Sequence, residues 1–305
     1  MRNVTVRYQD VLALDDLSLS LPAGEVFGYI GPNGAGKSTT MKVLASLLRP
    51  TSGSATIDGH DCTREGDAIR RIVGYMPDFL GVYDDLTVDE YLQFFAGAFG
   101  VARRKRRALV DGVLELTDLT GKRDAMVESL SRGMQQRLGV ARVLIHDPRV
   151  LLLDEPASGL DPRARIEMRS LLGELRAMGK TIIVSSHILS ELHEMCTQIG
   201  IIERGRLLFA GSLEDAFRLA GAGERIEIRL EHDAKSFVVT LDGDERVSSV
   251  KHDEHRLVVE LAPGEHGHHF LIERLVGAGA RIAAFEPRAR RLEDVFLRIT
   301  KGAVQ

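Results

Sequence analysis

The spacing of apolar and polar positions divides the chain into stretches of different character. In the first stretch, residues 4–76, short apolar runs such as Val26 to Ile30 alternate with a helical pattern from Lys37 to Leu48. Leucine at every second position from Leu17 to Leu21 has the spacing of a half-buried strand. This part of the chain therefore predicts strands that alternate with helices.

From about Gly81 to Asp147 the pattern becomes helical. Thr87 and Glu90 have the spacing of a capping box, and the apolar residues that follow supply one face of a helix. Apolar residues between Met134 and Ile145 recur at the i, i+4, i+7, i+11 spacing of a second helix. These positions predict a helical subdomain.

Strand and helix patterns alternate again after Pro148. We expect a buried strand from Val150 to Leu153, a helix face from Met168 to Met178, and strands from Thr181 to Ser185 and from Gly200 to Ile202. Strands that alternate with helices predict a parallel sheet covered on both faces. The expected fold class of this part is α/β.

Beyond residues 220–223, a glycine-rich segment with the composition of a linker, short strands predominate. The expected strands are 225–230, 246–251, 256–261 and 281–286, and the expected helices lie near 270–276 and 292–299. This pattern predicts a small α+β domain. We therefore expect one domain over residues 1–219, with its helical subdomain at about 81–147, and a second domain over residues 224–305.

Composition narrows the possible functions. Of the 305 positions, 44% are apolar and 28% charged, and the net charge of −4 gives no reason to expect nucleic-acid binding. Cys62 and Cys196 are the only cysteines and lack metal-binding spacing, so neither a disulfide nor a structural zinc is expected. Residues 1–8 lack the apolar region of a secretory signal, and no run approaches the roughly 18 apolar residues of a membrane span. Any membrane role is therefore expected to come through a partner.

Gly31 to Ser38 fits the pattern GxxxxGK[ST] and lies between an apolar strand and a helix. In that context the glycines let backbone N–H groups converge on phosphate oxygens, and the positive end of the helix points at the same place. Lys37 would neutralise the β- and γ-phosphates, and the Ser38 hydroxyl would bind Mg²⁺. The segment predicts a nucleotide phosphate site.

The apolar run Val150 to Leu153 ends in two carboxylates, Asp154 and Glu155. A buried strand would deliver Asp154 to Mg²⁺, directly or through water, and Glu155 would serve as general base for the attacking water. Apolar strands often end in an acid, so the motif gains its meaning from its place about 120 residues after the phosphate loop.

A second anion-binding helix start is expected at Ser131 and Gly133, where the serine is a natural N-cap and the glycine allows close backbone approach. On the local pattern alone, an ordinary capped helix remains the alternative. With both sites, one chain would carry two phosphate-type sites and a single nucleotide cradle.

The order of these motifs resembles that of the ABC transporter ATPase family over residues 2–215. Gly31 to Thr39 is similar to its Walker A loop, Leu130 to Gln136 to its signature motif, and Val150 to Glu155 to its Walker B strand. Ser158 to Asp161 resembles its D-loop. The fold implied is a P-loop NTPase core with an antiparallel β subdomain and a helical subdomain.

The resemblance also implies a set of site residues in a head-to-tail homodimer. ATP would contact Tyr8, Asn33, Gly34, Ala35, Gly36, Lys37, Ser38 and Thr39 of one copy and Ser131 and Gly133 of the other, with Asp161 in the same set. Tyr8 would stack on adenine, Glu155 would activate water, and His187 would contact the γ-phosphate. Mg²⁺ would be held by Ser38, Asp78 and Asp154.

Two departures from the family pattern stand out. The signature reads SRGM instead of SGGQ, a variant that resembles bacterial exporters more than importers. Asp78 stands where the family has a glutamine; an aspartate can still ligate Mg²⁺ but is shorter and charged. The segment Arg291 to Leu297 resembles the accessory tail of drug, antibiotic and polysaccharide exporters, with a plain terminal helix as the alternative.

Three other features are expected to be structural. Arg103 to Arg107 fits a solvated helix face, His266, His268 and His269 fit exposed histidines near a helix start, and the two cysteines fit small packing residues. The leading interpretation is an ATPase subunit at the cytoplasmic face of the cell membrane that drives a separate permease for export. A soluble ABC-type ATPase of a non-transport machine, and a non-hydrolysing regulatory subunit, are the alternatives.

Overall fold

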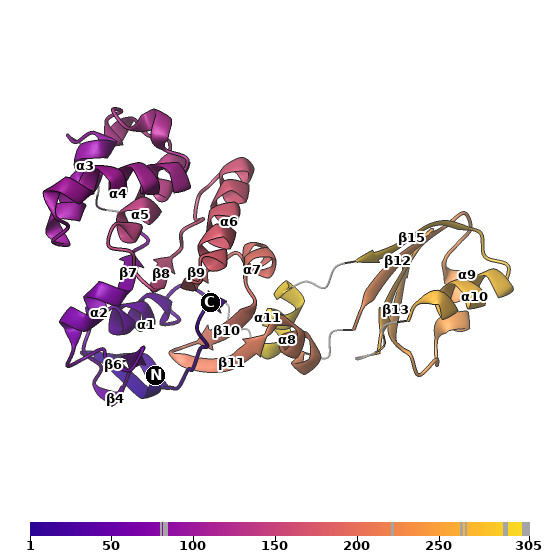
Figure 1. The fold of residues 1–305 in the computed structure, drawn as a ribbon. Coiled ribbons are helices and arrows are strands. Elements are labelled where there is room, and N and C mark those ends of the chain that lie inside the picture. The colour runs from indigo at the N-terminus through magenta and orange to yellow at the C-terminus, as the bar shows by residue number, and fades with distance from the viewer. Residues whose placement is uncertain are drawn as a thin grey trace. The chain divides into compact units, whose positions relative to one another are not determined.

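The computed structural model describes residues 1–79, 81, 85–220, 223–262, 265, 267–288 and 292–300. Contacts between residues divide the chain into two compact units, Met1–Ala210 and Gly211–Gln305 (Figure 1). The division falls before the glycine-rich segment that suggested a linker, because helix α8 (Leu213–Leu219) packs against helix α11 (Leu292–Ile299). The second compact unit therefore includes α8.

A largely parallel sheet forms the centre of the first unit. Over the described residues its strands, in spatial order, are β11 (Arg206–Ser212), β10 (Gln198–Glu203), β3 (Val26–Ile30), β9 (Thr181–Ser186), β8 (Val150–Asp154) and β7 (Val73–Met76). Every neighbouring pair from β10 to β7 is parallel. The register places Ile30 beside Ser186 and Asp154 beside Ser185. The carboxyl ends of β3, β9 and β8 therefore meet at one edge of the sheet.

Helices pack on this sheet and extend beyond it. Those that pack on its strands include α1 (Lys37–Leu44), α2 (Gly66–Ile72), α6 (Pro162–Ala177) and α7 (Leu189–Met195), and the helix α5 described next also packs on β7. Helices α3 (Val88–Ala98), α4 (Arg103–Leu116) and α5 (Arg132–Leu144) pack on one another and gather above the sheet in Figure 1, together with the short 3-10 helices η1 (Thr120–Lys122) and η2 (Val127–Ser129). The predicted capping box is confirmed, since Thr87 Oγ1 accepts from the Glu90 amide and the Glu90 carboxylate accepts from the Thr87 amide.

A smaller antiparallel sheet lies in the same unit, with β1 (Arg2–Tyr8) between β2 (Val11–Leu17) and β4 (Ser52–Ser54). Strands β5 (Thr56–Ile57) and β6 (His60–Asp61) form a separate pair. The strand predicted from Leu17 to Leu21 was wrong, because β2 already ends at Leu17. The backbone of Leu19 exchanges hydrogen bonds with the backbone of Met1. Burial alternates from Leu17 to Leu21 because this extended segment packs on the core without forming a strand.

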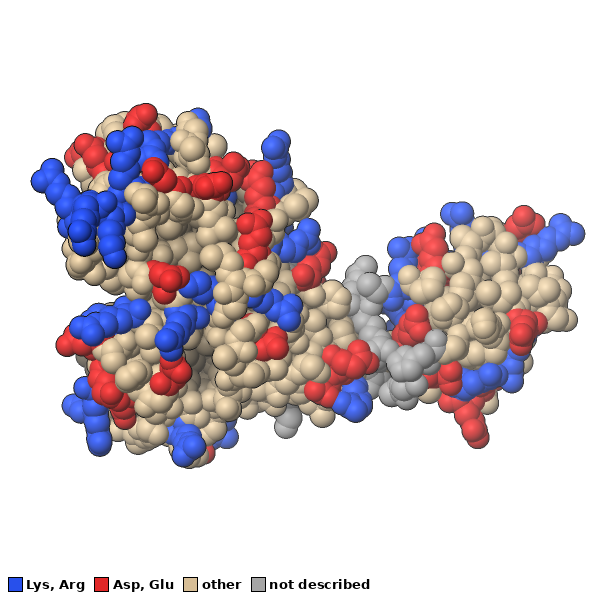
Figure 2. Space-filling model, viewed as in Figure 1, with Lys and Arg blue, Asp and Glu red and all other residues tan. Residues whose placement is uncertain are grey.

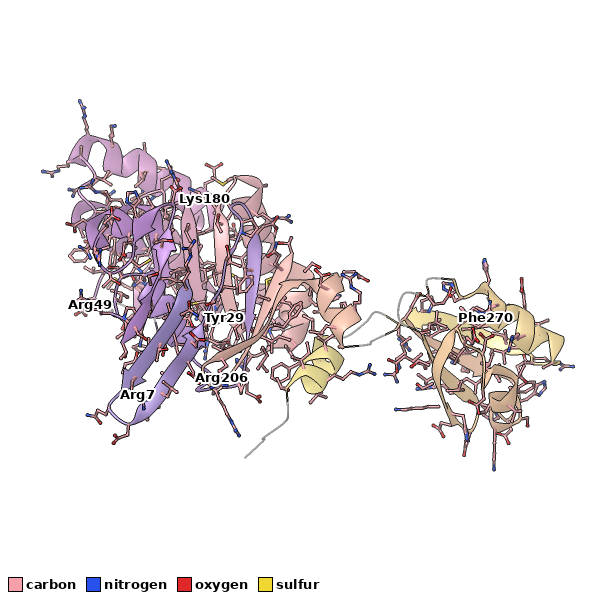
Figure 3. The ribbon with its side chains drawn as sticks, turned by 90° about the horizontal axis from the view of Figure 1, so that it is seen from below. Arg7, Tyr29, Arg49, Lys180, Arg206 and Phe270 are labelled. Carbon is pink, nitrogen blue, oxygen red and sulfur yellow. The ribbon has the colours of Figure 1, made fainter. Side chains whose placement is uncertain are left out.

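One hydrophobic core joins the two sheets. It includes Val4 and Leu14 from the antiparallel sheet and Tyr29 and Leu152 from the parallel one. The Tyr29 hydroxyl pairs with Thr40 Oγ1 on α1 at 3.1 Å in the buried interior (Figure 3). The shared core means that the phosphate-loop strand, the first helix and the antiparallel subdomain fold as one body.

The second unit contains an antiparallel sheet in the order β13-β14-β12-β15 over its described residues. Along the chain its elements are β12 (Arg225–Leu230), α9 (Lys235–Leu241), β13 (Val247–Asp253), β14 (Arg256–Leu261), α10 (His269–Gly277) and β15 (Ile282–Arg288). This β-α-β-β-α-β order is the ferredoxin-like arrangement. The second unit has its own hydrophobic core, in which alternate residues of β12 and β14 pack with apolar residues of α9 and α10.

Helix α9 was not predicted from the sequence. Its residues Phe237 to Thr240 are aromatic or β-branched, which favours strands. At its start, the Asp233 carboxylate accepts from the Lys235 amide at 3.0 Å. The helix forms because it packs against α10 and β13, with Leu241 fully buried. Tertiary packing overrides the local preference here.

In the second unit, the buried carboxylate of Asp244 links the loop after α9 to helix α10. Arg246 donates to Asp244 from Nε at 3.0 Å and from a terminal nitrogen at 2.9 Å, and Arg274 lies 2.9 Å from the same carboxylate. The Arg246 guanidinium also stacks 3.7 Å from the ring centre of Phe270, which is labelled in Figure 3. The hydrogen bonds from Arg246 lower the pKa of Asp244 from 3.8 to about 2.

We predict that the fold of the second unit loses stability in acid. Because the folded-state pKa of Asp244 lies below its ordinary value of 3.8, the pair stabilises the fold above that value and its contribution is lost as pH falls towards about 2. Peptide-resolved hydrogen exchange over residues 225–288 of the full chain, corrected for intrinsic rates, should show this loss in the wild type. Asp244→Asn should be less protected at pH 6 and should lose less between pH 4 and pH 2. The exposed Asp253→Asn is the control; equal acid responses of all three chains would contradict the prediction.

Candidate nucleotide site

The phosphate loop connects β3 to α1 and depends on glycine conformations. Gly34 and Gly36 have φ values of 79° and 112°, which side-chain-bearing residues rarely adopt. A Cβ atom at Gly36 would also lie 2.7 Å from the carbonyl oxygen of Ala13 on β2. The loop therefore packs against the antiparallel sheet at a distance that only glycine permits.

A pocket of about 180 Å³ opens over this loop. It is lined by Ala13, Pro32, Asn33, Gly34, Ala35, Gly36, Lys37, Ser38, Thr39, Asp78, Asp154 and Glu155. Four segments of the sequence thus meet here, and they include the phosphate loop and all three residues proposed for Mg²⁺. His187, proposed for the γ-phosphate, is outside this lining. Ala13 was missed by the sequence analysis, because an alanine in a strand carries no signal of a binding role.

Lys37 is the buried cation of this pocket. Its Nζ donates to the carbonyl oxygens of Gly31 at 2.6 Å and Pro32 at 3.3 Å, and lies 3.7 Å from Glu155 Oε1. Burial lowers the pKa of Lys37, while the Glu155 and Asp154 carboxylates oppose that shift. The loop carbonyls and the carboxylates therefore compensate an ammonium group that is only 7% exposed.

The carboxylates of Asp154 and Asp78 also line the pocket. Asp154 is 2% exposed at the end of β8. Burial, followed by the charges of Asp154 and Asp78, raises the pKa of Tyr75 to about 12. Asp78 therefore faces the same region as Asp154, as its place in the pocket lining requires.

Glu155 leaves the strand in a left-handed conformation, with φ 52°, which is uncommon for a residue with a side chain. Its backbone N–H donates to Ser185 Oγ at 2.9 Å, and its carboxylate lies 2.8 Å from His187 Nδ1. The side chain is thus held between His187 on one side and Lys37 on the other. The sequence analysis did not select Ser185, although a serine inside a buried apolar strand is a visible exception.

The second anion site lies elsewhere in the chain. Ser131 caps α5, and its hydroxyl accepts from the Met134 amide at 3.3 Å; Asp161 caps α6 through the Ala164 amide at 2.9 Å. A Cβ atom at Gly133 would meet the Cβ of Ala164 at 3.0 Å. Ser131, Gly133 and Asp161 are all outside the lining of the phosphate-loop pocket.

Tyr8 is also outside that lining, 42% exposed at the end of β1. Its role in stacking on adenine stays a prediction.

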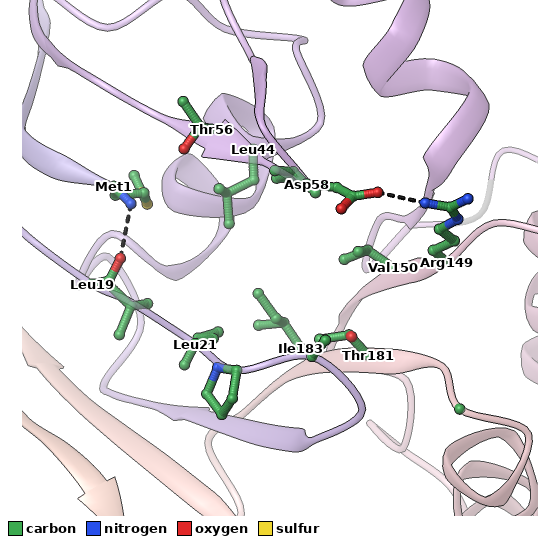
Figure 4. A pocket seen from close by; sticks show the side chains of 14 residues that line it. Met1, Leu19, Leu21, Leu44, Thr56, Asp58, Arg149, Val150, Thr181 and Ile183 are labelled. Carbon is green, nitrogen blue, oxygen red and sulfur yellow. Dashed lines mark hydrogen bonds and ion pairs between the residues drawn. The ribbon is translucent and has the colours of Figure 1, made fainter.

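A larger pocket, of about 650 Å³, lies at the opposite ends of the strands (Figure 4). Val150 and Thr181, the first residues of β8 and β9, line it together with apolar side chains such as Leu44 and Ile183. Its rim carries an ion pair of 2.6 Å between Arg149 and Asp58. The phosphate loop and the carboxylates of the smaller pocket are absent from its lining, so we place the nucleotide in the smaller pocket.

The features expected to be structural behave as follows. The basic run at the start of α4 is mostly exposed, and Figure 2 shows Lys and Arg gathered over that part of the first unit. Cys62 and Cys196 are buried free thiols, and burial raises their pKa values to about 11 and about 12. At the start of α10, His269 is exposed as predicted. The prediction was wrong for His268, which is half-buried because its ring packs against Phe285, and His266 lies outside the described residues.

The chain resembles known proteins over its whole length. A family model described as ABC transporter matches residues 14–158. Nod factor export ATP-binding protein I of Burkholderia orbicola is 38% identical over 311 residues, which cover 100% of this chain and 97% of that protein. An uncharacterized ABC transporter ATP-binding protein of Bacillus subtilis, YhcH, is 35% identical over 302 residues, which cover 98% of this chain and 95% of that protein.

Solved structures match the first unit. One, described as an ATP-binding subunit of an ABC transporter, has a TM-score of 0.65 and 30% identity, and covers 72% of this chain and 92% of its own. Another, a dimeric post-hydrolysis state of the ATP-binding cassette MJ0796 bound to ADP and Pi, has a TM-score of 0.63 and 26% identity, and covers 70% and 97%. The predicted P-loop fold is confirmed by these similarities.

We predict that the two loop glycines differ in how far they tolerate alanine. At Gly34, φ is positive but no atom lies within 4 Å of an added Cβ, so Gly34→Ala should cost only the ~1–2 kcal/mol of a left-handed alanine. At Gly36 the added Cβ also meets the Ala13 carbonyl, so Gly36→Ala should lower the melting temperature further. Thermal unfolding without nucleotide measures both. Equal melting temperatures would show that the contact with Ala13 relaxes without cost.

Proposed function

Because this chain belongs to the ATP-binding proteins of ABC transporters, which hydrolyse ATP, we propose that it powers a separate membrane permease that exports a polysaccharide-, lipid-, drug- or antibiotic-like cargo. The observation that carries the direction of transport is the 38% identity, over the whole chain, to relatives named for Nod factor export. That similarity includes the second unit, which solved cassettes covering 72% of the chain or less do not match. A role in a non-transport machine has no comparable support.

The donor set of the pocket supports Mg²⁺ as the companion of ATP. Ser38, Asp78 and Asp154 would offer one hydroxyl and two carboxylates, the hard oxygen ligands that this ion prefers. These residues would hold the ion, and the chemistry it would supply is neutralisation of negative charge on the nucleotide's phosphates. Asp78 in place of the family's glutamine keeps an oxygen at that position, and its lining of the pocket supports a working residue.

Glu155 is proposed as the general base. Its backbone is held by Ser185, and its carboxylate lies between His187 and Lys37, which limits the rotamers it can adopt. A γ-phosphate bound at Lys37 would bring the attacking water within reach of this carboxylate, which would take the proton. His187, 47% exposed at its side chain, would then contact the γ-phosphate from the solvent side.

A second copy of the chain is proposed to complete the site. Ser131 and Gly133 lie at a helix start outside the pocket, where their own chain presents no phosphate to them. In a head-to-tail dimer they would close over ATP on the partner, and the dimeric structure of MJ0796 supports that assembly for the family.

The permease is proposed to dock near Asp78. Phe79 follows this pocket residue and is 85% exposed, an apolar side chain in contact with solvent. In the part of the chain that the structure describes, no helix is long and apolar enough to span a bilayer. We therefore place the subunit at the inner face of the cell membrane, held there by its permease.

Glu155→Gln should retain ATP binding while its turnover falls by the ~10²–10⁴-fold that is typical of a lost general base. The variant should also accumulate as an ATP-bound dimer, which light scattering after gel filtration would detect. Adding Ser131→Arg should abolish that dimer, whereas Thr120→Arg, at an exposed position of η1, should leave it intact. Near-normal turnover of Glu155→Gln would contradict the assignment of the base; a dimer that survives Ser131→Arg would contradict the assembly.

Asp78→Ala should raise the Mg²⁺ concentration needed for half-maximal hydrolysis and weaken stimulation by the permease, because one oxygen ligand is lost beside Phe79. Asp78→Gln should be mild, since both side chains offer an oxygen to the cation. ATPase rates against Mg²⁺, with and without the co-expressed permease, measure both effects. The exposed Asp85→Ala is the control. If the Ala variant matches wild type in every condition, Asp78 has no part in the site.

A further inference from the structure

We propose that Ser185 is a positioning residue for Mg²⁺ and for the catalytic base, through a hydroxyl that bonds to both acidic residues at the end of β8. The inference rests on the proposed roles of Asp154 and Glu155. Ser185 lies outside the pocket lining, so it would act on the ion through Asp154 and would not ligate it.

The register of the parallel sheet brings the three residues together. Asp154 pairs with Ser185 across β8 and β9, and Ser185 is fully buried. Ser185 Oγ lies 2.9 Å from the Glu155 backbone nitrogen and 2.5 Å from Asp154 Oδ1. An amide N–H can only donate, so the hydroxyl accepts from Glu155 and gives its single proton to the Asp154 carboxylate. The short second distance is that of a charge-assisted bond.

Each bond meets a requirement of the site. Glu155 turns out of the strand with φ 52°, and its N–H takes the hydroxyl of Ser185 as its partner. A partly buried N–H without a partner is destabilising, so the serine supports this left-handed turn. The bond to Oδ1 restricts the rotation of the Asp154 carboxylate, which would otherwise be free to turn away from an incoming cation.

Ser185 is the first of two buried serines that end β9 after an apolar run. The preceding residues Ile182, Ile183 and Val184 are buried and apolar, as a strand inside a parallel sheet normally requires. A hydroxyl buried in such a strand costs free energy unless it is bonded, and both of its bonds reach the acidic pair. Packing alone would be served better by another aliphatic side chain.

The closing experiment compares four variants of the full chain. Ser185→Thr keeps the hydroxyl and adds a methyl group. Ser185→Val has nearly the shape of the Thr variant but no hydroxyl, and Ser185→Ala removes the hydroxyl with little change in volume. Thr181→Val removes a hydroxyl from the other end of β9, where Thr181 accepts from the Gly24 amide. Calorimetric titration of Mg²⁺ into each chain saturated with a non-hydrolysable ATP analogue gives the ion's affinity, and nucleotide binding in EDTA and thermal unfolding are measured beside it.

Loss of a residue that orients a metal ligand commonly lowers metal affinity 10–100-fold, so Val and Ala at position 185 should weaken Mg²⁺ binding about tenfold. Nucleotide binding in EDTA should stay within twofold of wild type, and the Thr variant and Thr181→Val should match wild type for the ion. A purely structural serine would lower the melting temperature of the Val variant without changing the Mg²⁺ affinity, and that result would overturn the proposal. Failure of the Thr variant to retain the affinity would do so as well.

Asp154→Asn in the same titration separates this inference from the proposed metal site. It should weaken Mg²⁺ binding at least as much as Ser185→Val does. If Asp154→Asn leaves the affinity unchanged, the assignment of Asp154 as a metal ligand fails. If it weakens binding while Ser185→Val does not, the metal site stands and the role of Ser185 is refuted.

Discussion

The parallel register of β3, β8 and β9 is the constraint on which the site depends. It aligns the carboxyl ends of the three strands, so that the phosphate loop after Ile30, the acidic pair after Leu153 and Ser185 meet at one edge. A one-residue slip between β8 and β9 would point Asp154 and Ser185 to opposite faces of the sheet. Nearly all residues of these strands are buried on both faces of the sheet, so a slip would have to repack the core on both sides.

Charge compensation is the second condition. Lys37 is buried beside Glu155 and near Asp154, and a buried ammonium costs free energy unless carboxylates or carbonyl oxygens face it. Its bonds to the Gly31 and Pro32 carbonyls hold it against the loop. The same carboxylates that compensate Lys37 are the groups proposed for Mg²⁺ and for water activation, so stability and chemistry share these residues.

The two units differ in how they are stabilised. In the first, one core spans the antiparallel sheet, the phosphate-loop strand and α1, so the binding loop rests on rigid elements. The second has a core of its own and a polar clamp in which two arginines hold Asp244. The similarity to Nod factor export ATP-binding protein I of Burkholderia orbicola covers 100% of the chain and therefore includes this unit.

The sequence by itself determined the parts whose physics is local. Glycines followed by lysine and serine between a strand and a helix predict a phosphate loop, because few other structures need that order of residues. The predicted caps at Thr87 and Ser131 are side chains that bond to amides three residues away. The resemblance of motif order to a known family then supplied Asp78 and His187 as site residues, and the structure places Asp78 in the pocket lining and His187 beside Glu155.

Only the tertiary structure decided the features that depend on distant segments. Ala13 lines the pocket because β2 packs against the loop at Gly36, and no pattern in residues 11–17 predicts that contact. Ser185 reaches Asp154 through a strand register, and α9 forms against its strand-like composition because α10 and β13 cover it. The division between the units falls before α8 for the same reason, since α8 packs against a helix more than seventy residues away. Pairings of this kind depend on the folded environment, which the order of residues along one segment does not encode.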